Sequence, residues 1–533
     1  MADMSSTMIQ RMFGGSAACR GSEVSAPSAT ARAAVPKRCV VMARFSICVR
    51  IPTIMITRRQ AVKSVAAASV GSAVGAAFSF AKTNRANLLF LCSDQHQTAA
   101  SGCYGSNEAQ TPHIDEIAAD GVRFDRAYCN APVCVPSRGS IITGLHPCRH
   151  GAKILRDPLP NEARTVAHYF KDHGYVTGAI GKMHFVDETR RHGFDHRLYR
   201  ADHDKRLTQA EQQAFRDDQY AAYPADGGYA TGLSGNASTL PERYFQDTFY
   251  AEESVAFLRE NKDRPFCLWS SFYMPHTPLV PAKQYWDMYD GVTLSLPERS
   301  DRELQDGFEG HLIRARQRGW YDQKDDDLRD AIRGYYGNTS QMDANVGRVF
   351  DTLRELGLDK NTVVVYTSDH GEMAGAHRTW TKHNMYEQSV SVPLIVRMPD
   401  RMEAGTARTQ LIEHADLLPT LTELCGLGSP SSGIDGRSFA PLVQGGAYTP
   451  REHAYSEYYF CHRSFTVDDR YVGKPPILMV RTGKWKLNYL SWARSELYDL
   501  EADPGEFNNV IDDTGNSGIV RELTAVAERL YAG

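Results

Sequence analysis

The stretch Leu88-Leu89-Phe90-Leu91-Cys92-Ser93-Asp94-Gln95 places five apolar residues directly before a serine, an acid and an amide. An unbroken apolar run of this length predicts a strand that is buried on both faces of a sheet. Residues 175–184 (YVTGAIGKMH), 266–276 (FCLWSSFYMPH) and 363–370 (VVVYTSDH) show the same pattern. Each predicted strand therefore carries an acid, an amine or an imidazole at its carboxyl end.

The segments between these runs favour helices. Apolar residues recur at helical spacing from Met342 to Leu356, and Gly357 then ends the helix. Alternating strands and helices predict an α/β fold, with one large, mostly parallel sheet sandwiched by helices over residues 86–445. Ligands bind at the carboxyl ends of strands in such sheets, so the polar residues can converge on one site. Residues 446–533 show short strands and turns, which predict a small C-terminal subdomain with an antiparallel sheet.

The bulk composition is that of an ordinary globular protein. The 533 residues are 42% hydrophobic and 23% charged, with a formal net charge of −4. Because there is no global basic field, we expect no nucleic-acid partner, and local cations or a metal must bind any anionic substrate. The eleven cysteines lack paired C-x-x-C spacing, which indicates neither a zinc site nor a disulfide framework.

The first eighty residues have the features of a targeting sequence. Residues 1–54 lack a clear apolar period, and we interpret them as a disordered leader or as sequence upstream of a true start codon at Met55. Residues 55–81 contain Arg58-Arg59 and then a weakly apolar run, the pattern of a twin-arginine export signal. A basic leader of another kind is the alternative. Export predicts a bacterial periplasmic or extracellular location, and we expect no membrane span in the mature chain because no later apolar run is long enough.

A second informative stretch is Cys134-Val135-Pro136-Ser137-Arg138-Gly139-Ser140-Ile141-Ile142-Thr143-Gly144. Pro136 suits the first turn of a helix, which would place Cys134 at a positive helix terminus beside the Arg138 guanidinium. An oxyanion would bind well there. From these residues alone, Cys134 could be a thiolate nucleophile of low pKa, as in cysteine phosphatases, or a cysteine merely buried at a helix start.

Polar residues at the ends of two predicted strands form a second candidate site. Asp94 and Gln95 follow the first strand, and Asp369 and His370 follow the strand within residues 363–370. Carboxylates in this arrangement can hold a hard divalent cation that also binds the oxyanion of a substrate. Two acids after apolar strands would alone be weak evidence for a metal.

The Cys134 stretch resembles the signature of the type I sulfatases, Cys-x-Pro-Ser-Arg-x-x-x-x-Thr-Gly, and matches it at every fixed position. This family, to which the arylsulfatases belong, implies an alkaline-phosphatase-like fold, since it is part of the alkaline phosphatase superfamily. The resemblance implies that a separate maturation enzyme oxidises Cys134 to formylglycine. The hydrated formylglycine then attacks the sulfur of a sulfate monoester, so the chain is expected to be a sulfatase, a hydrolase of sulfuric ester bonds.

The resemblance also implies one bound divalent metal. The family's metal ligands correspond to Asp94, Gln95, Asp369 and His370, with the formylglycine made from Cys134 completing the set. Calcium is the expected metal. Calcium prefers all-oxygen shells, however, and calcium-binding members usually carry Asn where this chain has His370, so manganese and magnesium are alternatives.

Four further side chains match functional positions of the family. Lys182 and His184 lie in Gly-Lys-Met-His-Phe, where the family has Gly-Lys-Trp-His-Leu, and the family roles place both near the formylglycine hydroxyls. His276 matches the histidine near the leaving-group oxygen, and Lys382 matches the lysine that binds sulfate. The predicted catalytic residues are Cys134, Arg138, Lys182, His184, His276 and Lys382.

The substrate is less closely defined by the sequence. By analogy with exported members of the family, we expect a sulfated glycan or small molecule, and a formylglycine-generating enzyme as a protein partner. Phosphonate monoester and phosphodiester hydrolases of the same superfamily are an alternative, because Asp94-Gln95 with Asp369-His370 suits either class. A non-catalytic sulfoglycan-binding protein is a further alternative, although a binding module has no need of Cys134 or His276.

Overall fold

A computed structural model of the chain describes residues 85–221, 233–300, 306–398, 403–430, 432–460 and 469–532. The predicted leader at residues 1–54 and the predicted export signal at residues 55–81 lie outside these ranges. Within the described ranges, no helix is both long enough and apolar enough to cross a bilayer.

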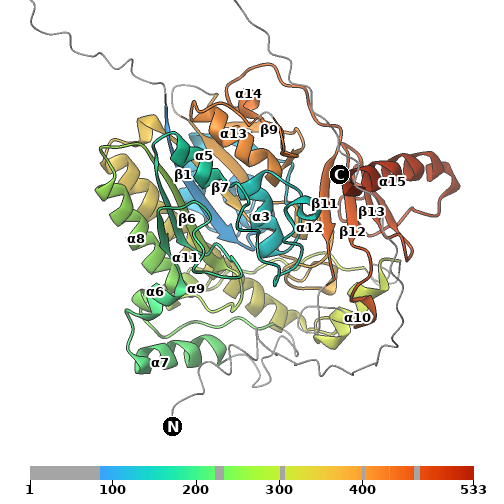
Figure 1. The fold of residues 1–533 in the computed structure, drawn as a ribbon. Coiled ribbons are helices and arrows are strands. Elements are labelled where there is room, and N and C mark those ends of the chain that lie inside the picture. Colours follow the sequence, from blue (N-terminus) through green and yellow to red (C-terminus); the bar gives the residue numbers. More distant parts are fainter. Residues whose placement is uncertain are drawn as a thin grey trace, which may run out of the picture. The chain divides into compact units, whose positions relative to one another are not determined.

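The four apolar runs form adjacent strands at the centre of an eight-stranded sheet (Figure 1). They are β1 (Asn87–Asp94), β4 (Val176–Gly181), β6 (Phe266–Pro275) and β7 (Thr362–Ser368). β1 pairs in parallel with β6 on one side and with β7 on the other, and β4 pairs in parallel with β6. The carboxyl ends of all four strands therefore meet at one edge of the sheet, as the sequence predicts.

Four shorter strands complete the sheet in the order β5-β4-β6-β1-β7-β8-β2-β9. They are β5 (His196–Leu198), β8 (Leu394–Arg397), β2 (Val122–Phe124) and β9 (Thr406–Arg408). β8 is antiparallel to both of its neighbours, and the other pairs are parallel. The prediction of a large, mostly parallel sheet is confirmed.

Helices cover both faces of this sheet. Successive side chains of β1 point to opposite faces, so the two sets pack against different helices. Leu89 and Leu91 pack against α2 (Pro112–Ala119), α8 (Gln246–Glu260) and α11 (Asp325–Glu355). Leu88 and Phe90 belong to the core on the other face, with α3 (Cys134–Thr143), α5 (Val166–Asp172) and α13 (Leu417–Leu424). Further helices and strands of this region are α4 (Pro147–His150), α6 (Arg200–Asp204), α7 (Gln209–Tyr220), α9 (Lys283–Asp287), α10 (Glu309–Gln317), α12 (Glu387–Val390), α14 (Ala440–Val443), β3 (Ala127–Tyr128) and β10 (Ile412–Glu413).

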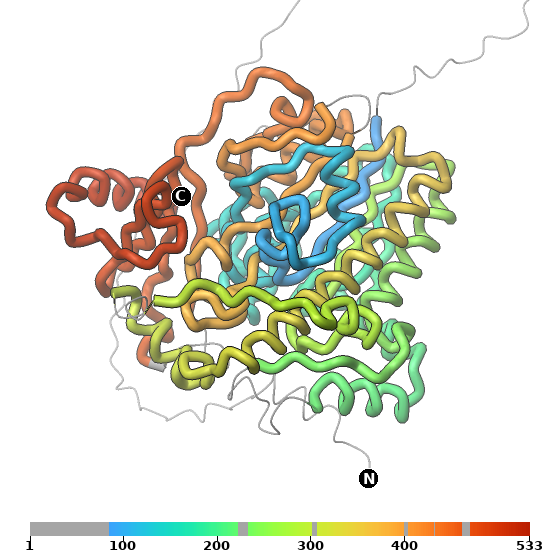
Figure 2. Tube along the Cα trace, turned by 180° about the vertical axis from the view of Figure 1, so that it is seen from behind, coloured from blue at the N-terminus to red at the C-terminus, as the bar shows by residue number. Residues whose placement is uncertain are grey.

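The C-terminal region forms a second sheet, which is antiparallel throughout as predicted. Its strands are β11 (Ala454–Tyr458), β12 (Ile477–Arg481), β13 (Trp485–Tyr489) and β14 (Glu496–Asp499). Helix α15 (Ser517–Ala532), coloured red in Figure 2, packs on one face of this sheet through Leu523 and Ala527. Met479 on β12 belongs instead to the core of the large sheet. The second sheet therefore packs against the part of the chain that contains the large sheet.

The end of β4 imposes a requirement for glycine just before Lys182. Gly181 has a φ of +96°, and a Cβ atom there would overlap the backbone carbonyl oxygen of Ser271. We expect Gly181→Ala to lower the free energy of unfolding by about 2 kcal/mol or more, since the strand would have to shift away from β6. Gly515→Ala, where the added methyl group meets no atom within 4 Å, is the matched control. Equal thermal unfolding midpoints for the two variants would contradict this account.

Candidate active site

Helix α3 brings Cys134 to the carboxyl edge of the large sheet. The helix begins at Cys134, has Pro136 in its first turn, and ends at Gly144, whose φ is 70°. Every residue of α3 is buried. The prediction that Cys134 lies at a helix N-terminus is confirmed, and the free N–H groups of that turn favour negative charge beside it.

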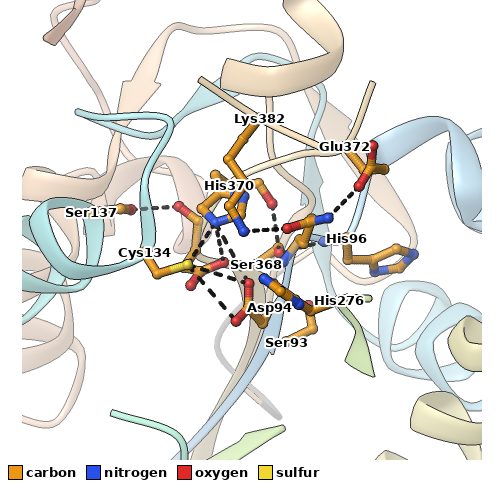
Figure 3. A network of polar contacts seen from close by, with 12 residues as sticks. Ser93, Asp94, His96, Cys134, Ser137, His276, Ser368, His370, Glu372 and Lys382 are labelled. Atoms are coloured by element: carbon orange, nitrogen blue, oxygen red, sulfur yellow. Dashed lines mark hydrogen bonds and ion pairs between the residues drawn. The ribbon is translucent and has the colours of Figure 1, made fainter. Parts of the chain in front are cut away.

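The ends of β1 and β7 place two acids and an imidazole around the thiol of Cys134 (Figure 3). The Sγ atom of Cys134 lies 3.1 Å from Nε2 of His370 and 3.7 Å from Oδ1 of Asp94. The ligand atoms of Asp94, Cys134, Asp369 and His370 all lie within 4.8 Å of one another, and all four residues are buried. Residues more than 200 positions apart in the chain thus form one cluster, because parallel strands end at the same edge.

The imidazole of His370 is oriented as a metal ligand would be. Its Nδ1 atom lies 3.0 Å from the carbonyl oxygen of Gly371, which can only accept a hydrogen bond. The proton is therefore on Nδ1, and the lone pair of Nε2 points at Asp94 and Asp369, each 3.5 Å away. Burial lowers the pKa of His370 to about 3, which keeps the ring neutral and able to coordinate a cation.

These donors fit a divalent cation. Two carboxylates and one imidazole suit calcium, magnesium or manganese, and the imidazole nitrogen is the donor that keeps manganese an alternative to calcium. The side-chain oxygen of Gln95, the remaining predicted ligand, accepts a hydrogen bond from Nζ of Lys382. Its amide nitrogen donates to Oε2 of Glu372.

Arg138 links α3 to three strands through a fully buried guanidinium. Its Nε atom donates to Oδ2 of Asp369 at 2.8 Å, and Nη1 donates to the hydroxyl of Ser271 at 2.8 Å and to the carbonyl of Lys182. Burial alone would raise the pKa of Asp369, but Arg138, with smaller contributions from His370, Lys182 and Lys382, outweighs burial, and together these groups hold that pKa well below its ordinary value. Asp369 is therefore an anion in the folded protein.

Lys182 lies on the other side of the cluster. Its ammonium group forms an ion pair with Asp94, lies 3.9 Å from Sγ of Cys134, and sits 4.4 Å above the ring of Tyr273. Burial lowers the pKa of Lys182 to about 7, since the charged form loses its hydration there. Lys182 therefore contacts the Cys134 sulfur directly through its ammonium group.

His184 and His276 are neutral bases in this environment. Burial lowers the pKa of both imidazoles well below the ordinary value, and the cations around them act in the same direction. Nδ1 of His276 lies 2.7 Å from the carbonyl oxygen of Thr277, which fixes its proton on that atom. Nδ1 of His184 is buried and has no hydrogen-bond partner among the described residues. Figure 3 shows His276 beside Asp94, facing the cluster.

The unmodified thiol of Cys134 is not activated. Burial raises its pKa to about 11, although Lys382 and Arg138 act against that rise. Burial thus acts against the thiolate interpretation, and it acts more strongly than the charge of Arg138 acts for it. A nucleophile at this position needs a chemistry other than a free thiolate at neutral pH.

Several polar residues support the site without having been identified from the sequence. Ser271 binds Arg138, and the hydroxyl of Tyr335 donates to the backbone carbonyl of Gln95 at 2.8 Å. Glu372 binds the side chain of Gln95, and Arg314 donates to the carbonyl of Lys382 at 2.6 Å. Of these four residues, only Glu372 could have been connected with the site from the sequence, because it lies two positions after the predicted metal ligand His370.

Comparison with known proteins agrees with this site. The sulfatase family profile matches residues 86–427 of the chain. The chain belongs to the sulfatase family. It is therefore a hydrolase acting on sulfuric ester bonds, and it falls in the alkaline phosphatase superfamily as predicted. A second profile, described as N-sulphoglucosamine sulphohydrolase, C-terminal, matches residues 375–532 of this sulfatase.

Individual relatives cover most of this sulfatase. A choline-sulfatase from Rhizobium meliloti is 29% identical over 457 residues, which are 84% of this chain and 86% of the relative. An N-acetylglucosamine-6-O-sulfatase from Bacteroides thetaiotaomicron is 26% identical over 520 residues, with the same two shares. A crystal structure of a phosphonate monoester hydrolase from Agrobacterium radiobacter superposes with a TM-score of 0.72 at 23% identity, covering 84% of this chain and 96% of the other, and confirms the predicted fold.

Removing the Arg138 side chain tests how far the site depends on its buried ion pair. Arg138 is 2% exposed and Asp369 is fully buried, so Arg138→Ala would leave an uncompensated buried anion. We expect a loss of about 3–5 kcal/mol in the free energy of unfolding, measured by denaturant titration. In the control Arg164→Ala, the lost partner is Asp172, and the two side chains are 54% and 53% exposed. The control should unfold like the wild type; an equal loss in both variants would refute the argument.

Proposed function

We propose that this sulfatase hydrolyses sulfate monoesters of a carbohydrate, with a hydrated formylglycine made from Cys134 as its nucleophile. The observation that carries the proposal is the position of Cys134. It lies at a buried helix N-terminus, 3.1 Å from a neutral imidazole of the metal-ligand cluster and 3.9 Å from the ammonium of Lys182. Oxidation by a maturation enzyme would remove the sulfur and leave an aldehyde, and its hydrate would supply one hydroxyl that attacks sulfur and another that later releases sulfate.

The raised pKa of the Cys134 thiol supports modification over direct use of the cysteine. A group whose pKa is about 11 is almost entirely protonated at neutral pH and is a poor nucleophile. The same cluster that disfavours a thiolate would favour a gem-diol, since carboxylates and imidazoles around it can accept its protons.

Three cations of the cluster suit the oxygens of a sulfate group. Nη2 of Arg138 is buried, has no hydrogen-bond partner among the described residues, and is free to donate to an oxyanion. Lys182 and Lys382 are buried nearby, at 4% exposure each. We assign to these three residues the stabilisation of the negative charge that spreads over the sulfate oxygens in the transition state.

Two histidines and a lysine divide the proton transfers. His184 is neutral and has an unpartnered ring nitrogen, which fits the base that deprotonates the nucleophile's hydroxyl groups. The only proton of neutral His276 is held by the carbonyl of Thr277, so its other nitrogen has no proton to give. Lys382 is therefore the better donor to the leaving alcohol, and His276 would accept a hydrogen bond beside it.

Asp94, Gln95, Asp369 and His370, with the oxygen that replaces the Cys134 sulfur, would hold one divalent metal, for which calcium is our first choice. The metal would neutralise charge on the sulfate oxygens as a Lewis acid. Loss of the sulfur makes the shell oxygen-rich apart from His370, which supports calcium, and magnesium or manganese are the alternatives.

The substrate class is inferred from the relatives. One relative acts on an N-acetylglucosamine 6-O-sulfate, and the C-terminal profile is that of an N-sulphoglucosamine sulphohydrolase, whereas another relative is a choline-sulfatase. Two of these three names denote carbohydrate sulfatases, so we propose a sulfated sugar. Export to a bacterial periplasm or beyond, and maturation by a formylglycine-generating enzyme, remain predictions from the sequence.

Mass spectrometry of the tryptic peptide from Ala127 to Arg138 tests the nucleophile. After thiol alkylation, we expect Cys129 to be alkylated and position 134 to have lost sulfur and gained an aldehyde, in protein expressed with a maturation enzyme. Cys129 is the internal control, since it lies in the same peptide and no modification is expected there. Cys134→Ala should abolish turnover of an aryl sulfate. Alkylation of both cysteines in active protein would refute the proposal.

Parallel assays on an aryl sulfate and an aryl phosphonate monoester separate the two hydrolase classes. We expect a higher kcat/KM for the sulfate, by about tenfold or more, because the proposed transition state spreads its charge over sulfate oxygens held by three cations. The phosphonate alternative has a specific basis, since the fold superposes on a phosphonate monoester hydrolase. A higher kcat/KM for the phosphonate would replace the proposed substrate.

A further inference from the structure

Glu372 occupies a fully buried position at the back of the cluster, where it accepts hydrogen bonds from two different parts of the site. Oε2 accepts from the side-chain amide of Gln95. Oε1 accepts from the backbone N–H of Ala374 at 3.0 Å and from the backbone N–H of Thr381. One carboxylate therefore contacts the residue that follows β1 and both ends of the loop that leads to Lys382.

The contacts with Lys382 and Glu372 together determine which way the amide of Gln95 points. The ammonium of Lys382 can only donate, so the amide atom facing it must be the oxygen. The amide nitrogen then faces Glu372, whose oxygens both serve as acceptors. Lys382 and Glu372 therefore hold this amide from its two ends, and without an acceptor at position 372 the donor from Lys382 alone would set its orientation.

The loop between Glu372 and Lys382 is strained and needs to be held. Four of its residues have left-handed backbone conformations that glycine adopts most easily, with φ values from 45° to 68°: Ala374, His377, Arg378 and Thr381. His383, directly after Lys382, has a φ of 82°. Met373 N donates to the carbonyl of Thr381 at 2.8 Å, which closes the loop at the same point as Glu372. Arg314 then holds the carbonyl of Lys382 and the hydroxyl of Thr381.

We propose that Glu372 is a positioning residue, which turns the Gln95 oxygen into the active site and fixes the loop that presents Lys382 to the substrate. The inference rests on the proposed function in so far as Lys382 and Gln95 act there on sulfate and metal. Glu372 itself reaches neither the substrate nor the metal. It acts through two other side chains, as the partners behind metal ligands commonly do.

The substitution Glu372→Gln separates these contacts with little change in volume. The oxygen of the new amide can still accept from the two backbone N–H groups, but its NH₂ group would then face Gln95. Gln95 must turn to present its oxygen, and its NH₂ group would face the ammonium of Lys382. We expect kcat/KM for an aryl sulfate and the affinity for calcium, measured by titration calorimetry, to fall roughly 10- to 100-fold.

Exchanging the two residues should restore the site. In the double variant Q95E/E372Q, a carboxylate at position 95 can accept from Lys382 with one oxygen and from the new amide with the other. We expect this variant to recover kcat/KM and calcium affinity to within about threefold of the wild type, whereas Q95E alone, with two carboxylates facing each other, should be impaired. A residue with a general packing role would show no such recovery.

Glu496→Gln is the matched control. Glu496 is also a buried carboxylate, and it accepts from an amide, that of Asn488 at 2.8 Å, and from the backbone N–H of Phe308 at 2.6 Å. It lies on β14, away from the cluster, so this variant should lose stability without losing kcat/KM or calcium affinity. Comparable losses of kcat/KM in E372Q and E496Q would overturn the proposal.

Each of the other possible outcomes also either supports or overturns the positioning role of Glu372. Activity and affinity of E372Q within twofold of the wild type, or a double variant no better than the weaker single variant, would overturn the positioning role. If E372Q does not fold, the double variant is compared with Q95E, and only a recovery supports the proposal. If the wild type turns over no sulfate ester, the proposed function fails, but calcium affinity still tests Glu372 by the same pattern of loss and recovery.

Discussion

The buried ion pair between Arg138 and Asp369 is the constraint on which the active site depends. A guanidinium and a carboxylate with 2% and 0% exposed side chains are tolerated because the two charges neutralise each other and share a hydrogen bond. The pair joins the first turns of α3 to the end of β7, and the second nitrogen of Arg138 ties in Ser271 on β6. Since Cys134 precedes Arg138 by one helical turn, the position of Cys134, the proposed nucleophile, is set by this pair.

Backbone strain is concentrated where the strands give way to the site. Gln95 follows β1 directly and His184 lies three residues after the end of β4; both have left-handed conformations, with φ values of 70° and 55°. A regular strand would continue past the edge and carry these side chains away from Cys134. The turn brings them back, at a cost of about 1–3 kcal/mol per residue that the surrounding contacts must offset. The backbone carbonyl of Gln95 is held by Tyr335, and its N–H by Asp369.

The sequence was sufficient for the central strands and for most of the site, for a physical reason. A strand buried on both faces is an unbroken apolar run, so the polar residue that ends it is conspicuous, as Asp94 and Asp369 are. The antiparallel direction of β8 was not predictable, because Leu394–Arg397 looks the same in either direction. Ser271 and Tyr335 were missed for a related reason: a serine within a strand and a tyrosine within a helix become part of the site only through tertiary packing.

The charges of the cluster also explain why an anion and a divalent cation belong there together. Arg138 contacts Asp369, Lys182 contacts Asp94, and Lys382 contacts Gln95. The carboxylate of Glu372 binds the side-chain amide of Gln95. The three cations and three carboxylates of this set balance, so neither sign dominates in the absence of ligands. A divalent cation alone would leave two positive charges in a buried site, and a sulfate ester alone would add a negative one. Bound together, a divalent cation and a sulfate dianion would restore the balance.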